Sequence, residues 1–234
     1  MGKVIMSGIV KPVVVPVTFD SVFANNTWEE IIKACQMKRV PDTWVIGDSK
    51  VMTINGTSYQ IDIIGKNHDD YADGSGKAPL TFQMHDCYGT SYKMNSSTTN
   101  SGGWTSCAMR STHLQAILAL MPSEVQSGVK EMSKKASAGN QSNTINTTAD
   151  GLFLLSEIEV FGSTDTSVSG EGTQYDYYKA GNSCVKTKSG SACGWWLRSP
   201  STSSSGGFCC VSTSGRKNFN DADTFNGVAF AFCF

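Results

Sequence analysis

The chain has 234 residues and a formal net charge of −1. Hydrophobic residues make up 39% and aromatic residues 10%, which is enough for a packed core. Charged residues make up only 17%, below the roughly 25% usual for soluble domains. Because there is no basic surplus to neutralise phosphates, nucleic acid is excluded as an expected partner. No apolar stretch is long enough to span a bilayer, so we expect no membrane insertion.

The extreme N-terminal segment predicts extended structure. Val13-Val14-Val15 lies between Pro12 and Pro16, and proline favours an edge strand over a central one. Residues 1–20 are therefore interpreted either as an assembly arm or as an ordinary first strand. The same residues lack the continuous apolar core of a signal peptide. We expect synthesis in a reducing cytosol, where the eight cysteines stay free and mostly buried.

Two local signals come next in the chain. Thr27 and Glu30 have the spacing of a capping box, which predicts a helix over roughly 27–37. Asn55-Gly56 separates the β-rich runs 51–54 and 59–64, and it suits the two positive φ angles of a type I′ turn. We expect a hairpin there, followed by a strand over residues 80–84.

The middle of the chain predicts two short helices. Ser111 or Thr112 can cap the first, whose apolar residues follow helical spacing up to Met121. Pro122 suits the first turn of the second. Lysines 130, 134 and 135 are interpreted as complementing the dipole at its end.

The last part of the chain predicts strands joined by long polar connections. Residues 152–161 are expected to form a strand with Glu157 and Glu159 on its outer face, and residues 227–234 a closing strand. Residues 89–103, 136–149 and 162–192 are expected to be polar loops. One hairpin, two or three helices and several strands indicate a compact α+β fold.

The string Trp195-Trp196-Leu197-Arg198-Ser199-Pro200, followed by Gly227-Val228 and a terminal aromatic strand, resembles a domain family of gut Firmicutes and their phages. Members of that family are C-type-lectin-like domains of the formylglycine-generating-enzyme type. The resemblance covers roughly residues 45–234. It implies a C-type-lectin-like fold with a small mixed or antiparallel sheet, two or three helices and long loops. Members usually end Gly-Val-Arg-Pro-Ala, whereas Ala229 and Phe230 replace the Arg and Pro here.

The resemblance also implies a variable segment at residues 201–226. In related proteins the stretch between Arg-Ser-Pro and Gly-Val can be the target of a diversity-generating retroelement, which randomises template adenines. Its favoured AAC codon cannot yield Lys, Glu, Gln, Met or Trp. Lys217 is the only residue of those types in the segment, which is suggestive of such diversification.

Aromatic anchors interspersed with small polar residues are typical of binding surfaces. We therefore predict a ligand-binding role for eleven residues of this segment: Ser203, Ser204, Ser205, Phe208, Ser212, Ser214, Asn218, Asn220, Asp221, Asp223 and Phe225. The alternative is that the phenylalanines, Phe219 included, belong to the core and that the serine run is a solvated loop.

Asp69, Asp70 and Asp73 crowd three carboxylates beside His68, and oxygen clusters of this kind suit Ca²⁺. The spacing does not match an EF-hand, so these residues are weak candidates, and their alternative is a set of Asx-type turns. We expect no other metal and no cofactor.

No nucleophile elbow or phosphate-binding loop appears, and three histidines leave few bases for a cysteine nucleophile. The adjacent Cys209 and Cys210 are a poor match for the paired thiols of formylglycine-generating chemistry. Arg198 is expected in the core, satisfied by backbone carbonyls or a carboxylate. Trp195 and Trp196 are expected in the scaffold, one buried and one near the base of the loop.

These features predict a non-catalytic binding protein, and the resemblance implies a display protein of a virion, associated with a phage tail and made in the bacterial cytoplasm. Residues 1–40 would dock to other tail proteins and form homo-oligomers, possibly trimers, and residues 41–234 would bind a host surface protein or glycan. Two alternatives stay open. One is an enzyme on the same fold that uses cysteine chemistry, and the other is a structural decoration protein.

Overall fold

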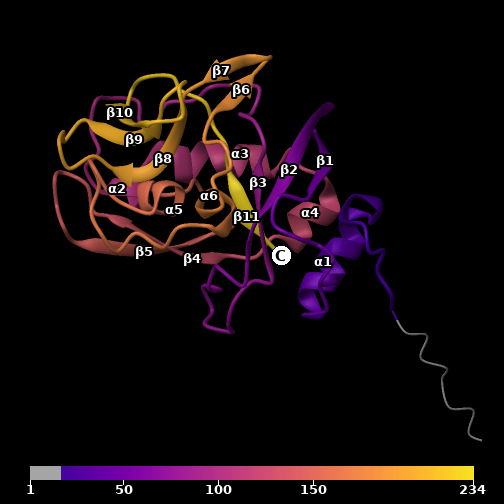
Figure 1. The fold of residues 1–234 in the computed structure, drawn as a ribbon. Coiled ribbons are helices and arrows are strands. Elements are labelled where there is room, and N and C mark those ends of the chain that lie inside the picture. The colour runs from indigo at the N-terminus through magenta and orange to yellow at the C-terminus, as the bar shows by residue number, and fades with distance from the viewer. Residues whose placement is uncertain (1–16) are drawn as a thin grey trace, which may run out of the picture.

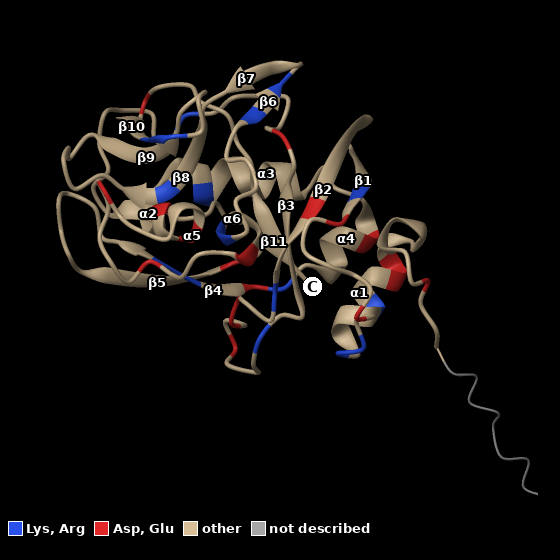
Figure 2. Ribbon diagram, in the orientation of Figure 1, with Lys and Arg blue, Asp and Glu red and all other residues tan. Residues whose placement is uncertain are grey.

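The computed structural model describes residues 17–234, which form a mixed α+β fold with small antiparallel sheets (Figure 1). The predicted arm lies almost wholly in residues 1–16, outside the described residues. Acidic and basic positions are interspersed along the ribbon (Figure 2). Over residues 17–234, every helix is too short or too polar to cross a bilayer.

A four-stranded antiparallel sheet occupies the middle of the molecule (Figure 1). Its order is β1 (Ser49–Ile54), β2 (Thr57–Lys66), β3 (Leu80–Met84) and β11 (Ala231–Cys233). Asn55 has φ 46° and Gly56 φ 78°, so the predicted hairpin turn is confirmed. The closing strand is confirmed as well, although it is shorter than the predicted 227–234.

The 3₁₀ turn η1 (Phe23–Asn25) and helix α1 (Trp28–Gln36) pack against this sheet. The predicted capping box is confirmed: the Glu30 amide donates to Thr27 Oγ1 at 3.2 Å, and the Thr27 amide donates to Glu30 Oε2 at 2.8 Å. The Trp28 ring lies 6.0 Å from that of Phe82 and 6.5 Å from that of Phe232. The helix thus shares the sheet's core, and its docking role stays a prediction.

A run of short helices follows: α2 (Gly103–Ser106), the π-turn η2 (Met109–His113), α3 (Leu114–Leu118) and α4 (Ser123–Gly128). The predicted cap at Ser111 or Thr112 is wrong, because the helical run already begins at Met109. The amides at that start are satisfied from elsewhere: Ala108 N donates to Asn95 Oδ1 at 3.1 Å and Met109 N to Met94 O at 3.1 Å. A cap from the next turn is therefore not needed.

The predicted loop 136–149 is wrong, because β4 (Met132–Ser137) and β5 (Ile145–Asp150) form an antiparallel hairpin. Helix α4 ends before the lysines that were expected to extend it. Met132, Lys134 and Ala136 all face inward from β4, with Lys134 buried among carboxylates. The expected helix-dipole role of Lys130, Lys134 and Lys135 is therefore also wrong, since the last turn of α4 contains no basic residue.

The predicted strand over 152–161 is also wrong. Phe153 makes one isolated bridge to Ala231, and the chain then turns into α5 (Glu157–Phe161). Ser156 and Glu159 form a second capping box, with Glu159 N donating to Ser156 Oγ at 3.2 Å. Glu157 and Glu159, expected on an outer face, are buried. The Ser-x-x-Glu spacing is a local signal for a helix, but the apolar run around it favoured the strand interpretation.

The expected polar insertion 162–192 contains helix α6 (Asp176–Lys179) and the hairpin β6 (Lys186–Lys188) and β7 (Ser191–Cys193). It is anchored in the core, since the Tyr178 hydroxyl donates to Gln83 Oε1 at 2.6 Å.

The second sheet has three antiparallel strands in the order β10 (Lys217–Asp221), β9 (Gly207–Val211) and β8 (Trp195–Pro200) (Figure 1). Trp195 and Trp196 on β8 are both fully buried. Their scaffold role is confirmed, and Trp196 also lies near the loop base, since its amide donates to Gly227 O at 3.0 Å, directly after segment 201–226.

Candidate functional site

The predicted variable segment 201–226 is divided between core and surface. Its middle is β9, the central strand of the three-stranded sheet, and every residue of β9 is buried. Strand β10 lies at the sheet edge, and all five of its residues are exposed or half-buried. Two loops and an edge strand are thus available to a partner, while the strand between them is not.

Phe208 is fully buried on β9, so the prediction that it is an exposed anchor is wrong. The reason is its position: a central strand is covered on both faces, and alternate residues face the core. Phe225 behaves as predicted, since 67% of it is exposed. The other predicted ligand-binding residues lie at the surface: Ser203, Ser205, Ser214, Asn218 and Asp221 are exposed, and Ser204, Ser212, Asn220 and Asp223 are half-buried.

A second loop joins this surface. Lys93 Nζ lies 5.0 Å from the centre of the Phe225 ring, a cation–π distance. Thr98 Oγ1 donates to Asp223 Oδ1 at 2.8 Å. We call Lys93, Thr98, Asp221, Asp223 and Phe225 the Phe225 face. The sequence indicated a polar loop at 89–103, but nothing local indicated that it would meet residues 221–225.

Asn100 holds the base of the segment. Its buried side-chain nitrogen donates to three backbone carbonyls, those of Ser201, Ser204 and Gly207, at 2.7 to 3.1 Å. Its Oδ1 accepts from Asn140 N at 2.7 Å. The loop backbone is therefore fixed by a residue outside the segment, and the exposed side chains at 203 and 205 can change without disturbing it.

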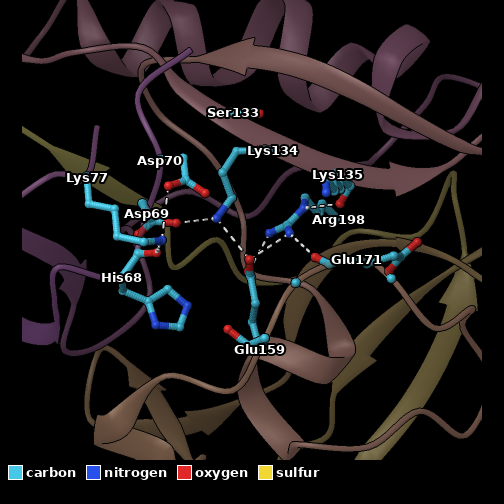
Figure 3. Close-up of a pocket in the computed structure, with 13 residues that line it drawn as sticks. His68, Asp69, Asp70, Lys77, Ser133, Lys134, Lys135, Glu159, Glu171 and Arg198 are labelled. Atoms are coloured by element: carbon cyan, nitrogen blue, oxygen red, sulfur yellow. Dashed lines mark hydrogen bonds and ion pairs between the residues drawn. The ribbon is translucent and has the colours of Figure 1, made fainter. Parts of the chain in front are cut away.

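A cavity of about 390 Å³ bordered by β4, α5 and β8 is lined largely by charged groups (Figure 3). Lys134 on β4 donates to Asp69 at 2.7 Å and to Glu159 at 2.9 Å. Arg198 on β8 donates to Glu159 and to the carbonyls of Lys135 at 2.9 Å and Leu154 at 2.8 Å. The core Arg198 predicted from the sequence is confirmed, with both kinds of partner present.

The charges in this cavity compensate one another. Burial would raise the pKa of Asp69, but Lys134 lowers it to about 2. Burial acts on Glu159 in the same way, and Arg198 and Lys134 hold its pKa below the ordinary value. Lys134 and Arg198 have side chains only 3% and 0% exposed. Because each cation is enclosed by its partners, we interpret the cluster as structural support for β8 and α5.

Glu171 is the exception, because burial raises its pKa to about 7, and hydrogen bonds from Ser199 and Ser137 together with the charge of Arg198 oppose the rise only in part. Its carboxyl group accepts from Ser137 N at 2.7 Å and bonds the Ser199 hydroxyl. A pKa raised on folding contributes stability below pH about 4.5, and that stability is lost as the pH rises through about 7.

Glu171→Gln should remove this pH dependence, because glutamine mimics the protonated acid in shape and hydrogen bonding. Urea unfolding from pH 4.5 to 8 should show the wild type losing about 3 kcal/mol relative to the variant. Parallel stability curves for the two proteins would show that Glu171 titrates normally in the folded state.

The three aspartates suggested for Ca²⁺ engage different partners. Asp69 bonds Lys134, Thr81 and Tyr175, Asp70 pairs with Lys77 at 3.0 Å, and Asp73 accepts from Ser75 N at 2.9 Å. The Asx turn at Asp73 agrees with the alternative interpretation. Within residues 17–234, no group of three or more His, Cys, Asp or Glu side chains is placed to hold a metal. The calcium site stays a prediction.

The thiols give little support to cysteine chemistry. All eight cysteines are free, and six of them are buried. Burial raises the pKa of Cys210 to about 12 and that of its neighbour Cys209 well above its ordinary value, so both stay protonated at neutral pH. Cys209 Sγ lies 3.3 Å from the Thr166 hydroxyl, which is not a base. The expectation that the protein is not an enzyme stays a prediction.

Comparison with known proteins gives one result. No curated protein and no solved structure matches the chain. Residues 77–234, more than half of the chain, match the model of a family described as a domain of unknown function (DUF6273), and the chain belongs to that family.

Proposed function

We propose that the protein is a non-catalytic binding module that presents the Phe225 face to a partner. The observation that carries this proposal is the exposure of Phe225, 67%, shortly after the edge strand β10. A large aromatic side chain held by a neighbouring lysine, with carboxylates and hydroxyls around it, is the composition of a binding hot spot.

The framework behind the face supports the proposal. β8 and β9 are buried throughout, and Arg198 and Asn100 bond the backbone of flanking segments. The exposed side chains at 203, 205, 214, 218 and 221 contribute little to this packing. These positions can therefore accept different residues that suit different ligands.

The resemblance of residues 45–234 to C-type-lectin-like phage proteins extends this proposal. On that basis the fold is of the C-type-lectin type and the ligand is a host surface protein or glycan. The protein is then carried on a phage tail as a homo-oligomer, where several copies compensate for weak single-site binding.

Labelled protein should bind one or more probes among a glycan array and a panel of gut Firmicutes cell envelopes. Phe225→Ala should weaken that binding by about 10-fold to 30-fold, because truncating a central aromatic residue costs about 2 kcal/mol. Val51→Ala is the matched control: Val51 is also a large exposed hydrophobic residue, 59% exposed, but lies on β1. Equal binding by the wild type and both variants, or no binding to any probe, would contradict the proposal.

A further inference from the structure

Two cysteines that are distant in sequence meet beside Gly227. Cys87 follows β3, and Cys193 is the last residue of β7. A Cβ atom built on Gly227 would stand 2.6 Å from Cys87 Sγ and 2.8 Å from Cys193 Sγ. The two sulfur atoms therefore flank one point, and only glycine at 227 leaves room for both.

The backbone around the pair is held by hydrogen bonds. Cys87 N donates to Thr187 O at 2.9 Å, which ties the segment after β3 to strand β6. Gly227 N donates to Gly194 O at 2.8 Å, next to Cys193. Three separate parts of the chain, at Cys87, Cys193 and Gly227, thus meet at one place and bring the two thiols together.

The two thiols differ in access to solvent. Cys87 is 4% exposed, whereas Cys193 is half-buried at the end of its hairpin. Burial raises the pKa of Cys87, and the charge and hydrogen bonding of the adjacent Cys193 raise it further. Cys193 is therefore the more accessible thiol, and Cys87 is the enclosed thiol on the same glycine.

We propose that Cys87 and Cys193 form a reversible disulfide site whose oxidant is a small-molecule disulfide such as oxidised glutathione. This inference does not depend on the proposed binding function, because it rests only on the meeting of the two sulfurs.

The reaction proceeds by two exchanges. The Cys193 thiol loses its proton to solvent and attacks oxidised glutathione, which forms a mixed disulfide and releases one glutathione thiolate. The Cys87 thiol then loses its proton to solvent and attacks Cys193 Sγ. The new Cys87–Cys193 bond forms as the second glutathione leaves. The two protein thiols are oxidised, and one oxidised glutathione is reduced to two glutathione thiols.

The other cysteines are poorer candidates for this reaction. Cys35 and Cys107 are 1% and 0% exposed, so neither offers a sulfur that a small-molecule disulfide can reach. Cys209 and Cys210 are consecutive on β9, so their side chains point to opposite faces. Cys184 is also half-buried and lies in the same insertion as Cys193, which makes it the matched control.

The disulfide would join the β6–β7 hairpin to the segment after β3, beside Gly227. A link between residues so far apart in sequence restricts the unfolded chain strongly. The oxidised protein should therefore melt about 5–10 °C above the reduced protein.

The test is incubation of the reduced full chain with oxidised glutathione, followed by peptide mass spectrometry without a reductant. A Cys87–Cys193 peptide should appear and should disappear after treatment with dithiothreitol. Cys193→Ser should abolish the cross-link, and Cys184→Ser should leave it unchanged.

Two results would overturn the proposal. One is glutathione retained on Cys193 while Cys87 stays a free thiol, and the other is a cross-link between Cys193 and Cys184. The wild-type protein alone distinguishes these results from the expected one, so the test does not depend on how well the variants fold.

Discussion

Arg198→Leu should destabilise the protein by about 3–5 kcal/mol, because the change removes one partner from a buried ion pair. Glu159 would keep Lys134 but lose the guanidinium that bonds both of its oxygens. The carbonyls of Lys135 and Leu154 would lose their donors in the interior. Urea denaturation should show a lower midpoint with little change in slope.

Arg216→Leu is the matched control for this experiment. Arg216 has the same side chain but is exposed in the turn between β9 and β10. A surface change of this kind should alter stability by no more than about 0.5 kcal/mol. Similar losses for the two variants would show that the guanidinium of Arg198 makes no special contribution to the core.

Gly139→Ala should cost about 3 kcal/mol or more, since it combines backbone strain with a backbone clash. Gly139 has φ +75°, and an added Cβ would stand 1.7 Å from the carbonyl oxygen of Asn100. Asn100 would have to move, and with it the hydrogen bonds that hold residues 201, 204 and 207. Thermal unfolding should show the loss directly.

Gly74→Ala is the control that separates backbone strain from the backbone clash. Gly74 has φ +76°, almost the same angle, but nothing lies within 4 Å of its added Cβ. Its variant should show only the left-handed strain, about 1 kcal/mol. If Gly139→Ala costs no more than Gly74→Ala, the loop of residues 137–142 is more adaptable than its packing indicates.

Arg198→Leu and Gly139→Ala both remove support from the predicted ligand-binding segment, at two different places. Arg198 connects β8 to α5, and Asn100 connects the segment base to the loop at Gly139. Each residue lies outside the predicted ligand-binding set, and each supports it. We therefore expect mutations there to affect folding first, whereas Phe225→Ala should affect binding alone.

The sequence by itself determined the elements whose signals are local. Thr27 and Glu30 satisfy each other's backbone amides, and Asn55-Gly56 adopts its turn without help from distant residues. The core position of Arg198 was also predictable, because a guanidinium beside two tryptophans in an apolar strand needs internal partners. Phe225, in a polar stretch, was correctly placed at the surface.

Only the tertiary structure decided that Lys134 and Phe208 are buried. The sequence predicted that Lys134 would lie at the end of a helix. It is instead buried on strand β4, because it forms ion pairs with Asp69 and Glu159, which are distant in sequence. Phe208 and Phe225 lie in similar polar stretches of sequence, and both were predicted to be exposed. Phe208 is in the core because β9 pairs with a strand on each side. Burial depends on neighbours that arrive from elsewhere in the chain, and local sequence patterns carry no information about those neighbours.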